Sequence, residues 1–318
     1  MSNRSSPRNL AADGGEQPPP EQVDSPAPSS TTPEAARYVV VLYQGQQGPF
    51  TTLRMDLVTH LRRMLEDRVA EPRENVELDL WLESPGGDAH AAYKLALLLR
   101  AYASRLRVVI PDYAKSAATL LTLAADEIYM GPAAELGPLD AQVPHEQEGI
   151  NISALDVARS LEDLATTAMG MALTGGGSIL QMTRLSRSES ISAMLDFAAK
   201  FMQPLVSKLD PKMIHWAGSL LDVSVKYGEQ LLAMRHQDTS PPAAEVAGLP
   251  RRLVEGYPTH GFVIGSGEAR RLRLPIKNAA NYPRWKEASA LHRSFEDSGT
   301  NMVELFEWAE LDALDDDD

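Results

Sequence analysis

The sequence predicts an α/β fold, in which a mainly parallel sheet with crossover helices is followed by a helical second half. Between Tyr38 and Met130, short apolar runs rich in β-branched residues alternate with longer segments of helical spacing. Strands that alternate with crossover helices form parallel sheets whose two faces are both covered. After Gly137 the short runs disappear, and apolar residues recur three to four positions apart, which is typical of helices.

Four strands are expected in the first half, at Tyr38–Tyr43, Val76–Leu82, Leu106–Ile110 and Glu127–Met130. Most of them are continuous apolar runs rather than alternating ones, as in strands buried on both faces. The helices expected between them are Thr51–Val69, Asp88–Tyr102 and Ser116–Ala125. Each strand except the last is therefore followed by a crossover helix, which is the order that a parallel sheet requires.

Three long helices are expected in the second half, at Ile152–Leu173, Ser190–Leu209 and 211–235. The three glycines at 175–177 are expected to end the first of them. Further on, a short helix is predicted near Gly267–Leu272, and one or two peripheral helices are predicted within Trp285–Glu310.

Composition suggests three parts. Residues 1–36 form a Pro/Ser-rich tail that has too few bulky apolar residues to offset the entropy of ordering, so we expect disorder. Residues 37–275 form the main domain, and 276–318 form a helical extension with an acidic tail. No apolar leader and no run of about 18 apolar residues is present, so we expect a cytoplasmic protein without membrane insertion.

Charge and residue content exclude several functions. The chain carries 30 basic and 44 acidic residues, a net charge of −14, which argues against binding to nucleic acid or anionic membranes. It has no cysteine, so thiol catalysis and Cys-ligated metals are excluded. No metal-binding motif and no phosphate-binding GxxxxGK[ST] motif occurs, so we expect no metal, no cofactor and no use of ATP.

Two polar segments follow neighbouring strands: Glu83-Ser-Pro-Gly-Gly-Asp88 and Tyr113-Ala-Lys-Ser-Ala-Ala-Thr119. Parallel sheets bind ligands at the carboxyl ends of their strands, so we expect these segments to converge. Backbone amides of Gly86 or Gly87, together with that of Ala117, would form an oxyanion hole beside Ser116. The competing interpretation is that Ser116 caps a helix and that the glycines only make a turn.

These motifs resemble the ClpP/crotonase superfold and, within it, the serine dehydrogenase proteinase group, relatives of signal peptide peptidase A. The resemblance rests on ESPGGD, YAKSAATL, ADEIYM and LGPLDAQV, and more weakly on LVEGYPTHGFVI, within residues 40–275. It implies a serine endopeptidase of the serine–lysine type, or a scaffold derived from one, that assembles into homo-oligomers. Ser116 is then the nucleophile.

The general base has several candidates. The resemblance places the lysine in LDFAAKFMQPL, which makes Lys200 the first choice and Lys208 the second. His145 is the alternative if the base is a histidine, as in ClpP-type enzymes. On a helical projection Lys200 lies opposite the apolar stripe, so it needs that polar face to roof the cleft, for example within an oligomer. His260 has no spaced carboxylate or histidine partner and is predicted to be structural.

The sequence therefore predicts an ATP-independent serine endopeptidase that cleaves extended polypeptides with Ser116 and Lys200. Two alternatives stay open. One is a crotonase-like acyl-CoA enzyme, which would use the paired amides for an enolate. The other is a non-catalytic oligomeric scaffold that binds peptides, which gains support if Lys200 proves exposed and far from Ser116.

Overall fold

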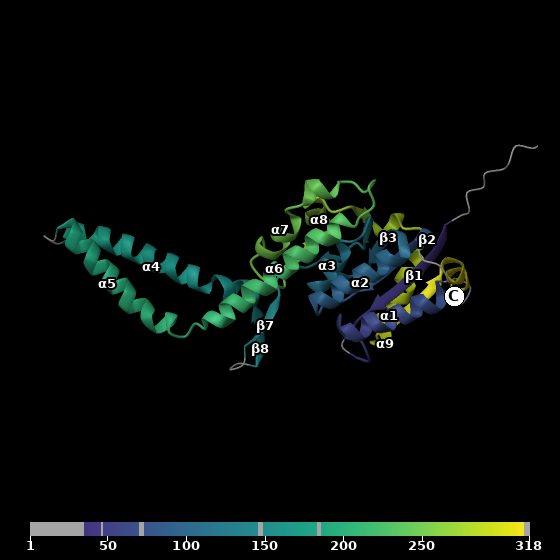
Figure 1. The fold of residues 1–318 in the computed structure, drawn as a ribbon, viewed down its shortest axis with the longest axis horizontal. Coiled ribbons are helices and arrows are strands. Elements are labelled where there is room, and N and C mark those ends of the chain that lie inside the picture. Colours follow the sequence, from purple (N-terminus) through teal and green to yellow (C-terminus); the bar gives the residue numbers. More distant parts are fainter. Residues whose placement is uncertain (1–34, 46, 70–72, 146–148, 183–185, 315–318) are drawn as a thin grey trace, which may run out of the picture. The chain divides into compact units, whose positions relative to one another are not determined.

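The computed structural model describes residues 35–314 apart from 46, 70–72, 146–148 and 183–185 (Figure 1). Most of the tail expected at 1–36, and the last four aspartates, lie outside the described residues. The main sheet contains β1 (Ala36–Tyr43), β2 (Arg73–Glu83), β3 (Ala103–Ile110), β5 (Glu127–Met130), β10 (Ile276–Asn278) and β11 (Met302–Glu307). Two small sheets contain β4 (Tyr113–Ala114), β6 (Glu135–Leu136) and β9 (Ile264–Gly265), and β7 (Gln142–His145) with β8 (Ile150–Ser153).

The helices of the first half are α1 (Met55–Arg68), α2 (Ala89–Tyr102) and α3 (Ala117–Thr122). Those of the second half are α4 (Ala154–Met182), α5 (Arg187–Val206), α6 (Pro211–Ala233), α7 (Leu249–Glu255), α8 (Ser266–Arg271) and α9 (Trp285–Ser298).

The main sheet has the strand order β10-β5-β3-β2-β1-β11. The first five of these strands run parallel, and only β11 runs antiparallel, beside β1. All four strands that the sequence predicts lie in this sheet, and α1 and α2 cross over between them. The predicted α/β class with a parallel sheet is therefore confirmed.

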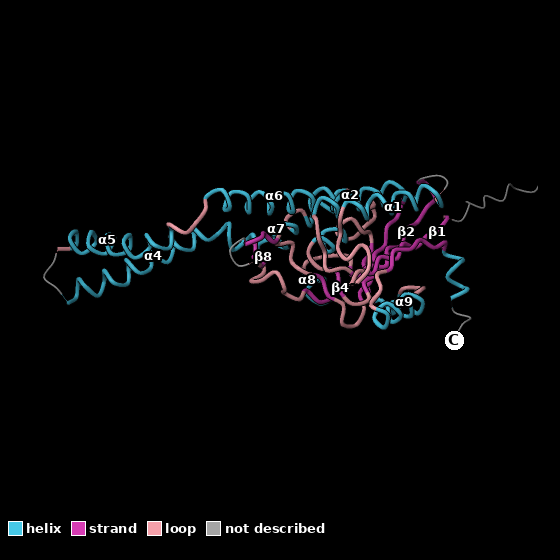
Figure 2. The backbone as a smooth tube through the Cα atoms, turned by 90° about the horizontal axis from the view of Figure 1, so that it is seen from below, coloured by secondary structure: helices cyan, strands magenta, loops and turns pink. Residues whose placement is uncertain are grey.

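The sheet is buried on both faces, which explains its continuous apolar strands. Val40 and Leu42 pack into a core shared with α1, α2, α3, α6 and α7, while Val39 and Val41 pack on the other face with α9. Figure 2 shows α1, α2 and α6 on one side of the strands and α9 on the other. Because side chains alternate along a strand, one run such as 39–42 supplies both cores.

The segment after 276 does more than add helices. It contains α9, as expected, but β10 and β11 also pair with the main sheet at its two edges. Gly299 ends α9 with a left-handed φ of 64°, and its amide donates to the Phe295 carbonyl at 2.8 Å. This turn lets the chain reverse into β11, so part of the segment predicted to be helical is an edge strand.

The prediction that the glycines at 175–177 end a helix is wrong, because α4 continues through them to Met182. Here the glycines serve packing between helices. A β-carbon at Gly175 would clash with the end of the Met194 side chain on α5, so the missing side chain lets the two helices approach closely. Ala172, Met194 and Ala198 form the small core between them. Within the described residues, no helix is both long and apolar enough to cross a membrane.

Candidate active site

The two motif segments converge, as their positions after neighbouring strands predict. The Ser84 amide donates to the Tyr113 carbonyl at 3.0 Å, and the Lys115 amide donates to the Ser84 carbonyl at 3.0 Å. The loop after β2 is thus paired to the strand that leads into Ser116. A β-carbon added at Gly86 would lie 3.0 Å from the Ser116 β-carbon, which shows how closely the two tips meet.

Ser116 is held in an unusual backbone conformation directly before α3. Its φ of 50° and ψ of −119° lie in a region that residues with side chains rarely adopt. Such strain costs about 1–3 kcal/mol and is concentrated at functional sites, as in the sharp strand-to-helix turn of hydrolase nucleophiles. The Ser116 side chain makes no capping hydrogen bond to the helix. This geometry favours the role of Ser116 as a nucleophile over its role as a helix cap.

The two glycines differ in what their amides do. The Gly86 amide donates to the Ser84 hydroxyl at 3.1 Å, and that hydroxyl donates to Gln44 at 2.6 Å. Gly87, with a φ of 142°, packs against the Leu53 backbone, and its amide has no hydrogen-bond partner among the described residues. The Gly87 amide is therefore the donor available to a ligand. Gly86, which has no side chain, lets the loop lie close to Ser116.

Gly86 also keeps the neighbouring amide accessible. Its added β-carbon would lie 2.6 Å from the Lys115 carbonyl oxygen and 3.1 Å from the Ala117 nitrogen. Any side chain there would cover the Ala117 amide, which begins a helix and has no carbonyl four residues earlier within that helix to bind. The Gly87 and Ala117 amides remain as the pair expected for an oxyanion hole.

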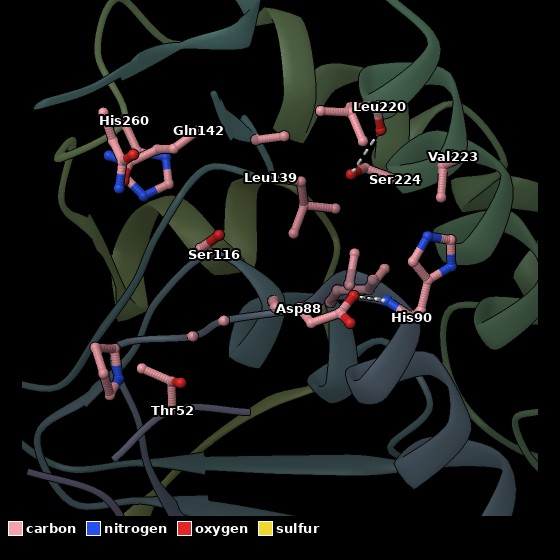
Figure 3. A pocket seen from close by; sticks show the side chains of 18 residues that line it. Thr52, Asp88, His90, Ser116, Leu139, Gln142, Leu220, Val223, Ser224 and His260 are labelled. Carbon is pink, nitrogen blue, oxygen red and sulfur yellow. Dashed lines mark hydrogen bonds between the residues drawn. The ribbon is translucent and has the colours of Figure 1, made fainter. Parts of the chain in front are cut away.

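A cavity of about 450 Å³ opens beside Ser116 (Figure 3). Its walls combine the glycine loop, the start of α3, the segment around β7 and the middle of α6. The apolar part is lined by Ala117, Leu120, Leu139, Ala141, Leu220 and Val223. The polar part is lined by Thr52, Asp88, His90, Gln142, Asn151, Ser224 and His260. A recess that combines apolar walls with convergent polar groups is typical of a binding site.

The predicted lysines lie elsewhere in the described chain. Lys200 is on α5, its side chain is 73% exposed, and its ammonium pairs with Asp196 at 2.7 Å. Lys208 is exposed in the turn after α5. Neither lines the cavity beside Ser116. The backbone of His145 ends β7, opposite Ile150. Lys115, next to the serine, pairs instead with Glu135.

Two histidines line the cavity, and sequence reasoning assigned a catalytic role to neither. The Nδ1 atom of His260 lies 2.7 Å from the Asp140 carbonyl oxygen, and Nδ1 of His90 lies 2.8 Å from the Tyr227 hydroxyl. Figure 3 shows the His260 ring beside Gln142 and the His90 ring on the other side of the cavity, near Asp88. His260 follows Ser116 by 144 positions, so no local spacing could link them.

A buried ion pair supports the glycine loop from behind. Glu83, which directly precedes Ser84, contacts Nε2 of His292 on α9. Burial raises the pKa of Glu83, although the contact with His292 opposes this. Burial alone would lower the pKa of His292, but the hydrogen bond and charge of Glu83 raise it above the ordinary value. The pair therefore retains a proton to a higher pH than the separated groups would.

Asp140 is another buried acid near the cavity. Burial raises its pKa, while hydrogen bonds from Ser153 and the Leu155 amide and the charge of His260 oppose the rise. Its side chain joins the β7–β8 segment to the start of α4, with the Leu155 amide donating at 3.1 Å. Asp140 therefore anchors the start of α4 to the segment that leads into β7.

Comparison with known proteins gives partial matches. MJ1495, an uncharacterized protein of Methanocaldococcus jannaschii, is 43% identical over 70 residues, which are 22% of this chain and 24% of the relative. The chain thus matches about a quarter of that relative's length.

Two solved structures align with about half of the chain. A ClpP1 mutant from Listeria monocytogenes covers 49% of this chain and 77% of its own, at 18% identity and a TM-score of 0.27. A mutant of the 1510-N membrane-bound stomatin-specific protease, in complex with a substrate peptide, covers 50% of this chain and 65% of its own. It is 19% identical, with a TM-score of 0.28.

A family model covers the region that holds both motifs. Residues 59–184 match the family described as ClpP-like SDH-type serine proteinase. These residues include the glycine loop and Ser116. The resemblance that the motifs suggested is thereby confirmed over this part of the chain.

Proposed function

We propose that this chain is a serine endopeptidase in which Ser116 is the nucleophile. The observation that carries the proposal is the strained Ser116 backbone, which holds the residue at a cavity beside the Gly87 and Ala117 amides. The Ser116 oxygen attacks a peptide carbonyl, and the two amides bind the oxyanion that forms. Each donor of this kind is worth about 10²–10³ in rate.

The substrate class follows from the walls of the cavity. Gln142 of β7 and Asn151 of β8 line it. These strands form a two-stranded sheet whose outer edges pair with no other strand in the part of the chain that the structure describes. An extended polypeptide can pair with such an edge while a side chain enters a neighbouring recess. The apolar wall formed by Leu120, Leu139 and Leu220 suits an apolar side chain next to the cleaved bond. The sequence offers no phosphate-binding loop, which supports activity without ATP.

Lys200 remains the predicted base, under one condition. Since it does not line the Ser116 cavity of its own chain, a second copy must bring it there. Exposed Phe197 and Phe201 flank it on α5 and stack on each other, which supports burial of this surface in a homo-oligomer. Assembly and a cytoplasmic location both belong to this proposal.

Cleavage of an unfolded protein such as casein, in buffer without ATP, tests the function. Wild type should produce fragments, and Ser116→Ala should reduce the rate by about 10⁴-fold or more. Ser219→Ala is the matched control, because Ser219 lies exposed on α6 with its hydroxyl bonded to the His215 carbonyl. Equal cleavage by wild type and Ser116→Ala, or none by either, would favour a non-catalytic peptide-binding scaffold.

A further inference from the structure

We infer that Asp88 selects substrates with a lysine or arginine next to the cleaved bond, an inference that rests on the proposed peptidase function. Asp88 lines the cavity beside Ser116 and directly follows Gly87, whose amide is the proposed oxyanion donor. Figure 3 shows the Asp88 side chain in this cavity, with Ser116 on one side and His90 on the other. A substrate whose carbonyl oxygen reaches the Gly87 amide therefore brings its neighbouring side chains to Asp88.

One carboxylate oxygen of Asp88 is left for a ligand. Asp88 caps α2, and its Oδ1 atom accepts a hydrogen bond from the His90 amide at 2.8 Å. Its backbone amide donates to the Leu53 carbonyl at 2.9 Å. In the described part of the chain, Oδ2 has no hydrogen-bond or ion-pair partner. An ionised carboxylate accepts hydrogen bonds at both oxygens, so the cap holds the side chain in place and leaves Oδ2 available.

The cavity carries a negative charge that no neighbouring lysine or arginine balances. Among the described residues that line it, Asp88 supplies the only carboxylate, and there is no lysine or arginine. The two histidines of the lining bond elsewhere through Nδ1, His90 to the Tyr227 hydroxyl and His260 to the Asp140 carbonyl. Because charge of one sign in a cleft focuses the electric field, this recess attracts a cationic group.

The place of Asp88 beside Gly87 makes this charge important for the reaction. Attack by Ser116 leaves a negative charge on the carbonyl oxygen that the Gly87 amide binds, and the Asp88 carboxylate belongs to the next residue. Like charges repel, so a carboxylate without a counterion opposes the formation of the oxyanion. A lysine or arginine paired with Asp88 removes this repulsion in the transition state, so the preference should appear in kcat as well as in KM.

The apolar part of the cavity suits the stem of the same side chain. Lysine and arginine place their methylene groups on apolar surface while the charged end reaches a polar partner. Leu120, Leu139 and Leu220 offer such a surface in the cavity that contains Asp88. The apolar wall and the carboxylate can therefore bind one long basic residue together.

The experiment compares wild type with Asp88→Asn and Asp56→Asn. Asparagine caps a helix about as well as aspartate, so Asp88→Asn removes the charge and keeps the start of α2, which circular dichroism checks. Asp56 lies in the first turn of α1, exposed and outside the cavity, so Asp56→Asn is the control for the same change in net charge. Ser116→Ala, purified in parallel, detects any contaminating protease.

Two measurements follow from these proteins. Mass spectrometry maps the bonds that each protein cleaves in unfolded casein. Peptides that carry lysine, norleucine or glutamate next to a mapped bond then give kcat and KM, since norleucine keeps the stem of lysine without its charge. Binding of the lysine and norleucine peptides to the inactive Ser116→Ala variant gives a readout that does not depend on turnover.

We expect wild type to cleave next to lysine or arginine, with kcat/KM at least about tenfold higher for the lysine peptide than for the norleucine peptide. The glutamate peptide should be cleaved most slowly. In Asp88→Asn the ratio of lysine to norleucine should fall to about one, whereas Asp56→Asn should keep the wild-type ratio. Ser116→Ala should bind the lysine peptide at least about threefold more tightly than the norleucine peptide.

Four results would overturn the role of Asp88 while the peptidase proposal stands. They are equal wild-type rates for lysine and norleucine, a lysine preference retained in Asp88→Asn, the same loss in Asp56→Asn, and equal binding of the two peptides to Ser116→Ala. A folded Asp88→Asn that cleaves neither peptide would also overturn it, because Asp88 would then act on every substrate. If wild type cleaves no bond in casein, the proposed peptidase function fails, and the inference about Asp88 fails with it.

Discussion

The sheet region and the α4–α5 pair differ in how far their apolar side chains are buried. Val39 and Leu42 in the central sheet are fully buried, whereas Leu173 on α4 is 71% exposed and Phe197 on α5 is 50% exposed. The first region completes its core and the glycine loop beside Ser116 within one chain. The second exposes the kind of surface that proteins cover with a partner. The sheet region is therefore complete in a single chain, whereas the proposed assembly involves the exposed surface of α4 and α5.

The largest expected effect is that of a substitution in the glycine loop of the first region. Gly86→Ala should lower peptidase activity by about 10²–10³-fold, because the added methyl group would cover the Ala117 amide. It should also lower the free energy of unfolding by about 1–3 kcal/mol, since Gly86 has a φ of 100°. Steady-state kinetics and urea unfolding measure the two effects.

Gly177→Ala is the matched control in the second region. Gly177 lies inside α4, where an added β-carbon meets no atom within 4 Å, so the change should stabilise the chain by about 0.5–1 kcal/mol. An active, stable Gly86→Ala variant would show that the Gly87 and Ala117 amides do not bind the oxyanion.

The next effect concerns the exposed surface. The double substitution Phe197→Ser and Phe201→Ser should raise the dissociation constant between copies at least tenfold, about 1.4 kcal/mol, because aromatic side chains dominate interfaces. Sedimentation velocity measures it. Met55→Ser removes an exposed apolar side chain from the first region and should leave assembly unchanged. Equal masses for all three proteins would mean that α5 does not contribute to assembly.

A smaller effect is the pH dependence set by Glu83 and His292. Both groups have raised pKa values in the folded chain, so the folded state binds more protons and stability falls as pH rises through these values. We expect the free energy of unfolding, measured by urea titration, to fall as the pH rises above the ordinary histidine pKa of about 6.5. His292→Gln should flatten this dependence and His215→Gln should keep it. A dependence retained in His292→Gln would assign it to other groups.

The smallest effect isolates the backbone strain at Ser116. Glycine adopts a φ of 50° freely, so Ser116→Gly should be about 1 kcal/mol more stable than Ser116→Ala, with both inactive. At Ser219, in the middle of α6, glycine should instead be less stable than alanine by a similar amount. Thermal unfolding of the four variants measures this, and the same order at both sites would mean that Ser116 is unstrained.

Much of the first region could be predicted from sequence because its signals are local. A continuous apolar run such as Tyr38–Tyr43 indicates a strand, and glycines directly after a strand indicate an exposed turn. Parallel pairing then places successive strand ends at one edge, which brings Gly87 and Ser116 together without knowledge of distant segments.

The remaining features depend on contacts between distant residues. β11 was not predicted, since its pairing with β1 joins residues about 260 positions apart. The glycines at 175–177 were predicted to end a helix because their packing partner, Met194, lies on another helix and cannot be identified from the local sequence. The position of His260 in the cavity wall could not be predicted, because its contact with the Asp140 carbonyl and its place in the cavity exist only in three dimensions.

The central claim, that the Gly87 and Ala117 amides activate the site around Ser116, is tested most directly by labelling with a fluorophosphonate. These reagents modify a serine only where an oxyanion site and an activated hydroxyl coexist. We predict one adduct per folded chain, mapped by mass spectrometry to the peptide that contains Ser116 and absent after denaturation. A folded protein that stays unlabelled, or that is labelled equally at other serines, would contradict the account.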